Sequence, residues 1–242
     1  MIEHTVVSHA EWVEARKKHL ADEKEFTKAR DRLSQARRDL PWEVVDKEYV
    51  FEGAGGRRTL DELFDGRGQL VVYHAMFNPD TASDQTSWTE EAACYACTFW
   101  MDNFNYVVVH LNHRDVTIAA VARAPYAKFS AYRKRMGWDF PVYSSAGSDF
   151  NLDYHVSFTP EQLKSGKVEY NYRVEPMGVS EREGVSVFLR DGSKIYHTYS
   201  TYARGLDLLN VAYNYLDIVP KGRDEGRDGA MAWLHRRDEY PD

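Results

Sequence analysis

Two short apolar runs, at residues 70–73 and 116–121, dominate the pattern of hydrophobic and polar positions along the chain. Both consist almost entirely of aliphatic and aromatic residues, which is typical of strands that are buried on both faces. Between them, apolar side chains recur at helical spacing over residues 98–113: Phe99, Trp100, Phe104, Val107, Val108 and Leu111. The pattern therefore predicts a strand, a helix and a second strand in succession.

The pattern after residue 122 predicts five further elements in this order: a helix at residues 125–136, a strand at 140–144, a long irregular loop at 147–183, a hairpin formed by 185–190 and 194–199, and a helix at 204–216. The hairpin prediction depends on Asp191-Gly192, a strong turn sequence. Together the elements predict an α/β sandwich with a mixed sheet.

The start and the end of the chain differ from this central part. Ser8 and Glu11 have the spacing of a capping box, and the residues that follow are dense in Ala, Glu, Lys and Arg with charges of alternating sign. This composition is typical of a solvated helix, and the alternative is a dimerisation arm that makes the protein a homodimer. We therefore expect a helical extension at residues 1–40, an α/β domain at 41–220 and a polar C-terminal tail at 221–242.

Charge and hydropathy exclude several classes of partner. The formal net charge is -7, which gives no reason to expect a general affinity for nucleic acid or for anionic membranes. No apolar run reaches the length of a transmembrane helix, and the start of the chain lacks the basic and apolar regions of a signal peptide. We therefore expect a cytoplasmic protein, although an exported protein whose signal had been removed would look the same.

The chain contains two cysteines, and both lie in Cys94-Tyr95-Ala96-Cys97 at the start of the predicted helix. In a reducing compartment such a pair is more often catalytic or metal-binding than structural, and beside a strand–helix–strand pattern it points to a thioredoxin-like redox site. Unpaired N–H groups at a helix start favour a thiolate. We therefore assign Cys94 as the attacking thiol and Cys97 as the thiol that resolves a mixed disulfide. The nearby Glu90 and Glu91 would oppose thiolate formation if they faced the sulfur.

Several stretches carry a family resemblance: residues 72–74, the cysteine motif, and residues 110–116, 135–138, 147–151 and 197–205. They resemble an uncharacterised bacterial family of thioredoxin-like proteins that is classified as a domain of unknown function. The resemblance covers nearly all of the chain after the first helix, and it implies a thioredoxin-like three-layer α/β sandwich with a central mixed sheet but no activity. Thioredoxins place a cis-proline before the hairpin, where this chain has Arg182-Glu183-Gly184. The proline and threonine that precede the reactive cysteine of peroxiredoxins are also missing, so we do not expect peroxidase activity of that type.

Histidines raise the alternative of a metal site. The spacing Cys94-x2-Cys97-x12-His110-x2-His113 approaches that of a zinc finger. A continuous helix from Cys97 to His110 would separate the two pairs by roughly 20 Å, which one tetrahedral ion cannot bridge. His155, in the predicted loop, is the histidine expected to approach the cysteines, and two cysteines with one histidine suit Cu(I).

The sequence as a whole favours a dithiol/disulfide oxidoreductase that requires no cofactor and exchanges disulfides with a protein or a small thiol. One alternative is a copper-type binding or delivery protein that uses Cys94, Cys97 and His155 as ligands. Another is a scaffold whose thiols are inert.

Overall fold

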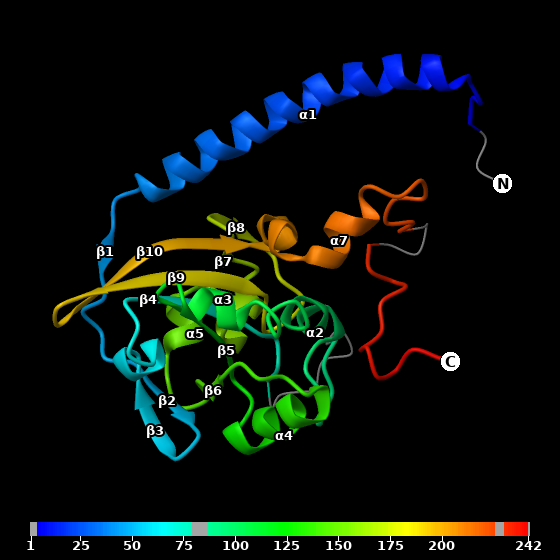
Figure 1. Ribbon diagram of the computed structural model, residues 1–242. Coiled ribbons are helices and arrows are strands. Elements are labelled where there is room, and N and C mark those ends of the chain that lie inside the picture. The colour runs from blue at the N-terminus through cyan, green and yellow to red at the C-terminus, as the bar shows by residue number, and fades with distance from the viewer. Residues whose placement is uncertain (1–3, 79–86, 226–229, 242) are drawn as a thin grey trace. The chain divides into compact units, whose positions relative to one another are not determined.

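The computed structural model describes residues 4–78, 87–225 and 230–241 (Figure 1). Contacts along the chain divide it into two compact units, Met1–Trp42 and Glu43–Asp242. The helices and strands of the second unit follow one another in this order: β1 (Glu43–Val44), β2 (Val50–Gly53), β3 (Gly56–Thr59), the 3-10 helix η1 (Asp61–Phe64), β4 (Gln69–His74), α2 (Tyr95–Met101), α3 (Val108–Asn112), β5 (Val116–Ala122), α4 (Tyr126–Met136), β6 (Val142–Ser144), α5 (Phe150–Asp153), α6 (Pro160–Ser165), β7 (Val168–Tyr170), β8 (Arg173–Glu175), β9 (Gly184–Asp191), β10 (Lys194–Tyr202), the 3-10 helix η2 (Ala203–Leu209) and α7 (Val211–Leu216).

The first unit contains one helix, α1 (His9–Arg38). The Ser8 hydroxyl accepts a hydrogen bond from the Glu11 backbone N–H at 3.3 Å, and the Glu11 carboxylate accepts one from the Ser8 backbone N–H at 2.9 Å. The predicted capping box is thus confirmed. All residues of α1 are described and none is buried, so Trp12 and Phe26 are exposed. Long as it is, α1 is too polar to cross a membrane, and no other helix in the described ranges is long and apolar enough.

Among the described residues, an eight-stranded mixed sheet forms the centre of the second unit, in the order β1-β10-β9-β4-β5-β6-β2-β3. β4, β5 and β6 are parallel, and the other neighbouring pairs are antiparallel. The two apolar runs are the central strands β4 and β5, which pair from Gln69 opposite Val116 to His74 opposite Val121. The predicted hairpin is β9–β10, and β9 pairs with the other edge of β4. The predicted mixed sheet is therefore confirmed.

Side chains alternate between the two faces of this sheet, and helices cover both faces. Tyr73 and Ala120 belong to one core cluster, together with side chains from α2, α4, η2 and α7. Val72 and Val121 belong to a second cluster, together with side chains from η1 and α5. Because adjacent residues of a strand point to opposite faces, each central strand supplies both clusters. The result is the thioredoxin-like three-layer α/β sandwich that the sequence predicts.

The single helix predicted for residues 98–113 is wrong, because α2 ends before Asp102 and α3 starts only after a stretch of turns. Polar side chains in this gap make hydrogen bonds elsewhere. Asp102 accepts one from the indole N–H of Trp138 at 2.7 Å, and Asn105 accepts one from the backbone N–H of Asp139 at 2.6 Å. Aspartate and asparagine side chains compete with helical backbone bonding in this way, and periodicity does not reveal their distant partners.

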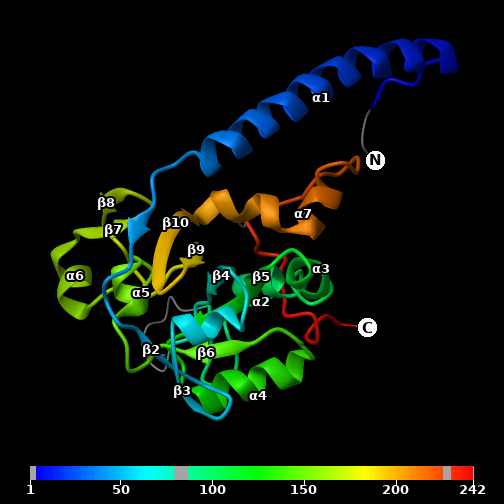
Figure 2. The same cartoon turned by 60° about the vertical axis from the view of Figure 1, so that its left-hand side comes forward.

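Residues 147–183, which we expected to be an irregular loop, instead form α5, α6 and the β7–β8 hairpin. Figure 2 shows these elements grouped on one side of the second unit. They share a small hydrophobic core with the end of β10: Val156, Phe158, Val168, Tyr170 and Tyr202. The helix predicted at residues 204–216 is also divided, since Asn210 separates η2 from α7 and its side chain caps α7.

The C-terminal stretch, expected as a tail at residues 221–242, packs over part of its length on the rest of the second unit. Leu234 and Arg236 are buried. Met231 and Trp233 pack against the same core cluster as α2. The stretch therefore contributes side chains to the face of the sheet that carries the cysteines.

Candidate active site

Cys94 and Cys97 lie where β4 leads into α2, and both are free thiols. Cys94 is the N-cap residue of α2, and Cys97 lies in its first turn. Hydrogen bonds connect them to Met76, two residues after the end of β4. The Cys94 backbone N–H donates to the Met76 carbonyl at 3.0 Å, and the Met76 N–H donates to the Cys97 sulfur at 3.3 Å. The cysteines thus occupy the helix start that the sequence predicts.

A cavity of about 290 Å³ leads to the two cysteines, and we call it the cysteine cavity. The Cys94 and Cys97 residues are 0% and 1% exposed, so a reaction partner must reach their thiols through this opening. Its walls come from distant parts of the chain, and include Tyr73, Met76, Ser87, Trp100, Glu183, Leu206 and Met231.

Cys94 is the more acidic of the two thiols. Burial disfavours its thiolate, but hydrogen bonds from the Cys97 side chain, from the Ser87 hydroxyl at 2.8 Å and from the backbone N–H groups of Cys97 and Ala96 outweigh burial and lower its pKa. The backbone donors are the N–H groups that a helix start leaves without partners. A lower pKa increases the fraction of thiolate, which is the form that attacks a disulfide.

Cys97 is held in its protonated form. Burial raises the pKa of the Cys97 thiol well above its usual value, and the hydrogen bond to Cys94 and the charges of Cys94 and Glu183 raise it further, against the opposing effect of Tyr73. The two thiols of the pair therefore differ: one is poised to ionise and the other to keep its proton.

Glu183 and Tyr73 are site residues that the sequence analysis missed. Glu183 directly precedes β9, at the place where the resemblance leads one to expect a cis-proline, and the described residues contain no cis peptide bond. Burial raises the pKa of the Glu183 carboxyl. The Tyr73 hydroxyl is buried near Cys97 and has no well-aligned hydrogen-bond partner among the described residues. The missing proline was the one sequence feature that pointed to Glu183.

Glu90 and Glu91, which would oppose the thiolate if they faced it, are both exposed. Glu90 forms an ion pair with Lys128 at 2.9 Å. Their charges are therefore screened by solvent, and neither is among the main influences on the pKa of Cys94.

Arg236, in the C-terminal stretch, fixes the segment that precedes Cys94. Its guanidinium donates to the Ala93 carbonyl from Nε at 3.0 Å and from Nη2 at 2.7 Å, and its Nη1 pairs with Glu239 at 3.1 Å. The Arg236 residue is only 8% exposed, so its hydrogen bonds to the Ala93 carbonyl are buried and charge-assisted. No pattern in the polar C-terminal sequence indicates this contact.

A second buried carboxyl, Glu181, holds the chain just beyond β4. It accepts hydrogen bonds from the Phe77 backbone N–H at 3.2 Å, the Asn78 amide at 3.2 Å and the Ser157 hydroxyl at 3.1 Å. Burial raises its pKa to about 7, against the opposing effects of the Arg123 charge and of these hydrogen bonds. Glu181 therefore changes charge near neutral pH, beside the segment that leads from β4 to the cysteines.

The predicted approach of His155 to the cysteines is wrong. His155 is exposed and lines a different cavity, because residues 147–183 fold into elements of their own instead of covering the thiols. The break between α2 and α3 does not bring a zinc-finger set together either, since His110 and His113 are exposed while the cysteines are buried. Within the described ranges, no group of three or more His, Cys, Asp or Glu residues is placed to hold a metal ion.

Similar solved structures include a peroxidoxin, BcpB, from Mycobacterium tuberculosis, with 13% identity, a TM-score of 0.45 and coverage of 70% of this chain and 93% of that chain. A peroxiredoxin Q from Xanthomonas campestris has 15% identity, a TM-score of 0.42 and coverage of 74% and 91%. A hypothetical protein from Sinorhizobium meliloti has 14% identity, a TM-score of 0.38 and coverage of 65% and 70%. Comparison with the curated proteins gives no match. The model of the family described as "Bacterial protein of unknown function (DUF899)" matches residues 1–240, and the chain belongs to that family.

Proposed function

We propose that this protein is a dithiol/disulfide oxidoreductase that acts through Cys94 and Cys97. The observation that carries the proposal is the difference between the two thiols, since Cys94 has a lowered pKa at the start of α2 and Cys97 has a raised one. An attacking thiol must ionise readily, whereas a resolving thiol must stay protonated until a mixed disulfide has formed. The two positions suit these two tasks.

The reaction has two exchange steps. First, the Cys94 thiolate attacks one sulfur of a substrate disulfide, a Cys94–substrate disulfide forms, and the other substrate sulfur leaves as a thiolate that takes up a proton. Second, Cys97 loses its proton and attacks the Cys94 sulfur, so that the internal disulfide forms and the remaining substrate thiolate leaves. The substrate disulfide gains two electrons, the protein dithiol loses two, and an external thiol reduces the protein again.

Glu183 is the group we assign to take the proton from Cys97. It is buried, and its charge is close enough to raise the pKa of the Cys97 thiol. A carboxylate whose own pKa is raised by burial is a stronger base than an exposed one, which suits general-base catalysis near neutral pH.

The proposal includes the partner and the compartment. The cysteine cavity admits small groups between apolar walls such as Trp100, Leu206 and Met231, which fits a small disulfide or a cysteine side chain of another protein. We propose that the partner is of this kind, not a nucleic acid or a membrane, and that the two thiols need no cofactor. The cytoplasm is the proposed compartment, because its thiol pool keeps such a pair reduced.

A trapping experiment tests the proposal. With glutathione disulfide as the probe, the Cys97→Ser variant should keep one glutathionyl group on Cys94, which intact-mass measurement detects. The wild-type protein should release glutathione and form an internal disulfide, with loss of both free thiols. The matched control is Cys94→Ser, in which the remaining Cys97 has a raised pKa and should react much more slowly.

Two results would contradict the oxidoreductase. If the wild-type protein forms no internal disulfide and carries close to one metal ion per chain, which Cys94→Ser loses, the thiols serve metal binding. If the pair neither oxidises nor binds metal in the folded protein, the thiols are inert and the protein is a scaffold.

A further inference from the structure

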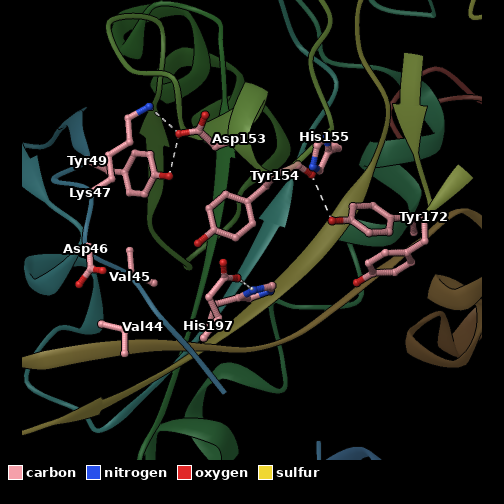
Figure 3. Close-up of a pocket in the computed structure, with 12 residues that line it drawn as sticks. Val44, Val45, Asp46, Lys47, Tyr49, Asp153, Tyr154, His155, Tyr172 and His197 are labelled. Carbon is pink, nitrogen blue, oxygen red and sulfur yellow. Dashed lines mark hydrogen bonds and ion pairs between the residues drawn. The ribbon is translucent and has the colours of Figure 1, made fainter. Parts of the chain in front are cut away.

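A second cavity, of about 380 Å³, lies apart from the cysteines. Its lining shares no residue with the cysteine cavity. Figure 3 shows the rings of Tyr49, which precedes β2, of Tyr154, which follows α5, and of Tyr172, in the β7–β8 turn, arranged around it. We call it the tyrosine cavity after the four tyrosines that line it: Tyr49, Tyr154, Tyr172 and Tyr202.

The tyrosine cavity carries an excess of negative charge. Three carboxylates line it, those of Glu43, Asp46 and Asp153, against the single ammonium of Lys47. Lys47 is already engaged, because it pairs with Asp153 at 2.6 Å and with Asp149 outside the lining at 2.9 Å. A positively charged ligand would therefore be attracted to the cavity and an anion repelled.

The aromatic walls are suited to the same kind of ligand. The ammonium of Lys47 lies 5.6 Å from the centre of the Tyr49 ring, so one wall already has a cation over it. Tyr154 directs its hydroxyl into the cavity (Figure 3), and the Tyr172 residue is 71% exposed. Faces of tyrosine rings attract ammonium groups most strongly where water is partly excluded.

The backbone holds two of the lining side chains in unfavourable conformations. His155 follows the C-cap residue of α5 with φ 53°, and Tyr172 is the second residue of the turn between β7 and β8 with φ 59°. Glycine is the usual residue at such left-handed positions after a helix or in a two-residue hairpin turn. Large side chains kept where glycine would be unstrained are typical of a binding site.

We propose that the tyrosine cavity binds an organic cation, specifically a compact alkylated ammonium group. Such a group presents carbon and diffuse positive charge, which matches ring faces beside carboxylates and needs no set of metal ligands. An anion would meet the carboxylates of Glu43 and Asp46, and an uncharged ligand would gain nothing from them. The proposal does not depend on the redox chemistry of the cysteines.

Calorimetric titration with choline tests the proposal. The matched probe is the uncharged alcohol of the same shape, in which a carbon atom replaces the ammonium nitrogen. Choline should bind at one site per chain and at least about tenfold more tightly than the alcohol, because only the cation gains from the ring faces and the carboxylates. Equal affinities, or no binding of choline by the folded wild-type protein, would overturn the proposal.

Variants then locate the site. Tyr172→Leu removes an exposed ring face without opening the core, and Asp46→Asn removes one carboxylate charge. Each should weaken choline binding by about fivefold or more and leave the affinity for the alcohol unchanged. Glu175→Gln, an exposed acid on β8 outside the lining, is the control and should bind choline as the wild type does. Thermal unfolding of each variant verifies that it is folded, and choline binding that survives both cavity variants would place the cation elsewhere and contradict the proposal.

Discussion

The core clusters beside the cysteine cavity and the tyrosine cavity lie on opposite faces of one strand, β4. Tyr73 packs in the core cluster that contains Cys94 and Cys97. Its neighbour His74 stacks on the other face, 5.9 Å from the Tyr154 ring that lines the tyrosine cavity. Because successive side chains of a strand alternate, two adjacent residues can support two different chemistries.

The two faces differ in the buried groups that titrate. Beside Phe77, which packs in the same core cluster as the cysteines, burial raises the pKa of the Glu181 carboxyl to about 7. On the tyrosine side, burial lowers the pKa of the fully buried His74 to about 3, with a smaller contribution from His197. His74 is the inner end of a chain of hydrogen bonds. Its Nε2 lies 2.9 Å from the Ser186 hydroxyl, and the Ser186 hydroxyl lies 2.8 Å from the Ser200 hydroxyl. The Ser200 hydroxyl in turn lies 2.7 Å from His197 Nε2. Burial favours the neutral form of both groups, one an acid and the other a base. Their contributions to the free energy of unfolding should therefore change with pH in opposite directions.

Glu181→Gln should have the largest effect on how the free energy of unfolding depends on pH. The folded state binds the Glu181 proton more tightly than the unfolded state, whose pKa is near 4.5, so the stability from the neutral carboxyl is present at low pH and is lost as the pH rises through about 7. This contribution should lower the free energy of unfolding by about 2 to 3 kcal/mol between about pH 5 and pH 8. Because His74 titrates with the opposite sign over the same range, the test compares the two proteins: in urea unfolding from pH 5 to pH 8 the wild type should lose about 2 to 3 kcal/mol relative to Glu181→Gln. Equal pH slopes in the two proteins would contradict the assignment.

Elements built from neighbouring residues could be predicted from the sequence. The capping box of Ser8 and Glu11, the strands β4 and β5 and the turn at Asp191-Gly192 depend on short-range patterns, and all of them are found. The position of Cys94 and Cys97 at a helix start was predictable for the same reason, because the motif and the helix pattern adjoin.

Features that depend on residues far apart in the chain could not be predicted. The Trp138 indole donates a hydrogen bond to the Asp102 carboxylate just after α2, and Arg236 donates to the Ala93 carbonyl, 143 residues earlier in the chain. Neither contact leaves a periodic pattern in the sequence. The error over His155 has the same origin. The periodicity of the sequence does not show that residues 147–183 form helices and a hairpin of their own. The distance from His155 to the thiols could therefore not be predicted.

His74→Gln should have the next largest effect, with the opposite sign to that of Glu181→Gln. The folded pKa of His74 lies below the unfolded value of 6.5, so the stability from the neutral imidazole is present above pH 6.5 and is lost as the pH falls toward about 3. At about pH 5 the wild type should lose about 2 kcal/mol relative to pH 8 through this residue, and the variant should not. Glutamine can keep a hydrogen bond to Ser186. Because the two contributions oppose each other over the same pH range, the wild type and the variant carrying both substitutions should show flatter pH profiles than either single variant. A double-variant profile as steep as that of either single variant would refute the opposing signs.

Arg236→Ala should have the smallest effect on stability and should act on the cysteine side alone. Loss of the hydrogen bonds to the Ala93 carbonyl should lower the free energy of unfolding by about 1.5 kcal/mol, the typical lower value for hydrogen bonds with a charged partner. The freed segment before Cys94 should expose the thiol, so that in the Cys97→Ser background Cys94 reacts faster with iodoacetamide. Arg237→Ala is the matched control, because the Arg237 side chain is 45% exposed and lies 3.6 Å from Asp102 instead of bonding the Ala93 carbonyl. Choline binding should be the same in the wild type, in Arg236→Ala and in Arg237→Ala. If Arg236→Ala also weakened it, the two cavities would be coupled through the sheet, and the separation drawn from the alternating side chains of β4 would be wrong.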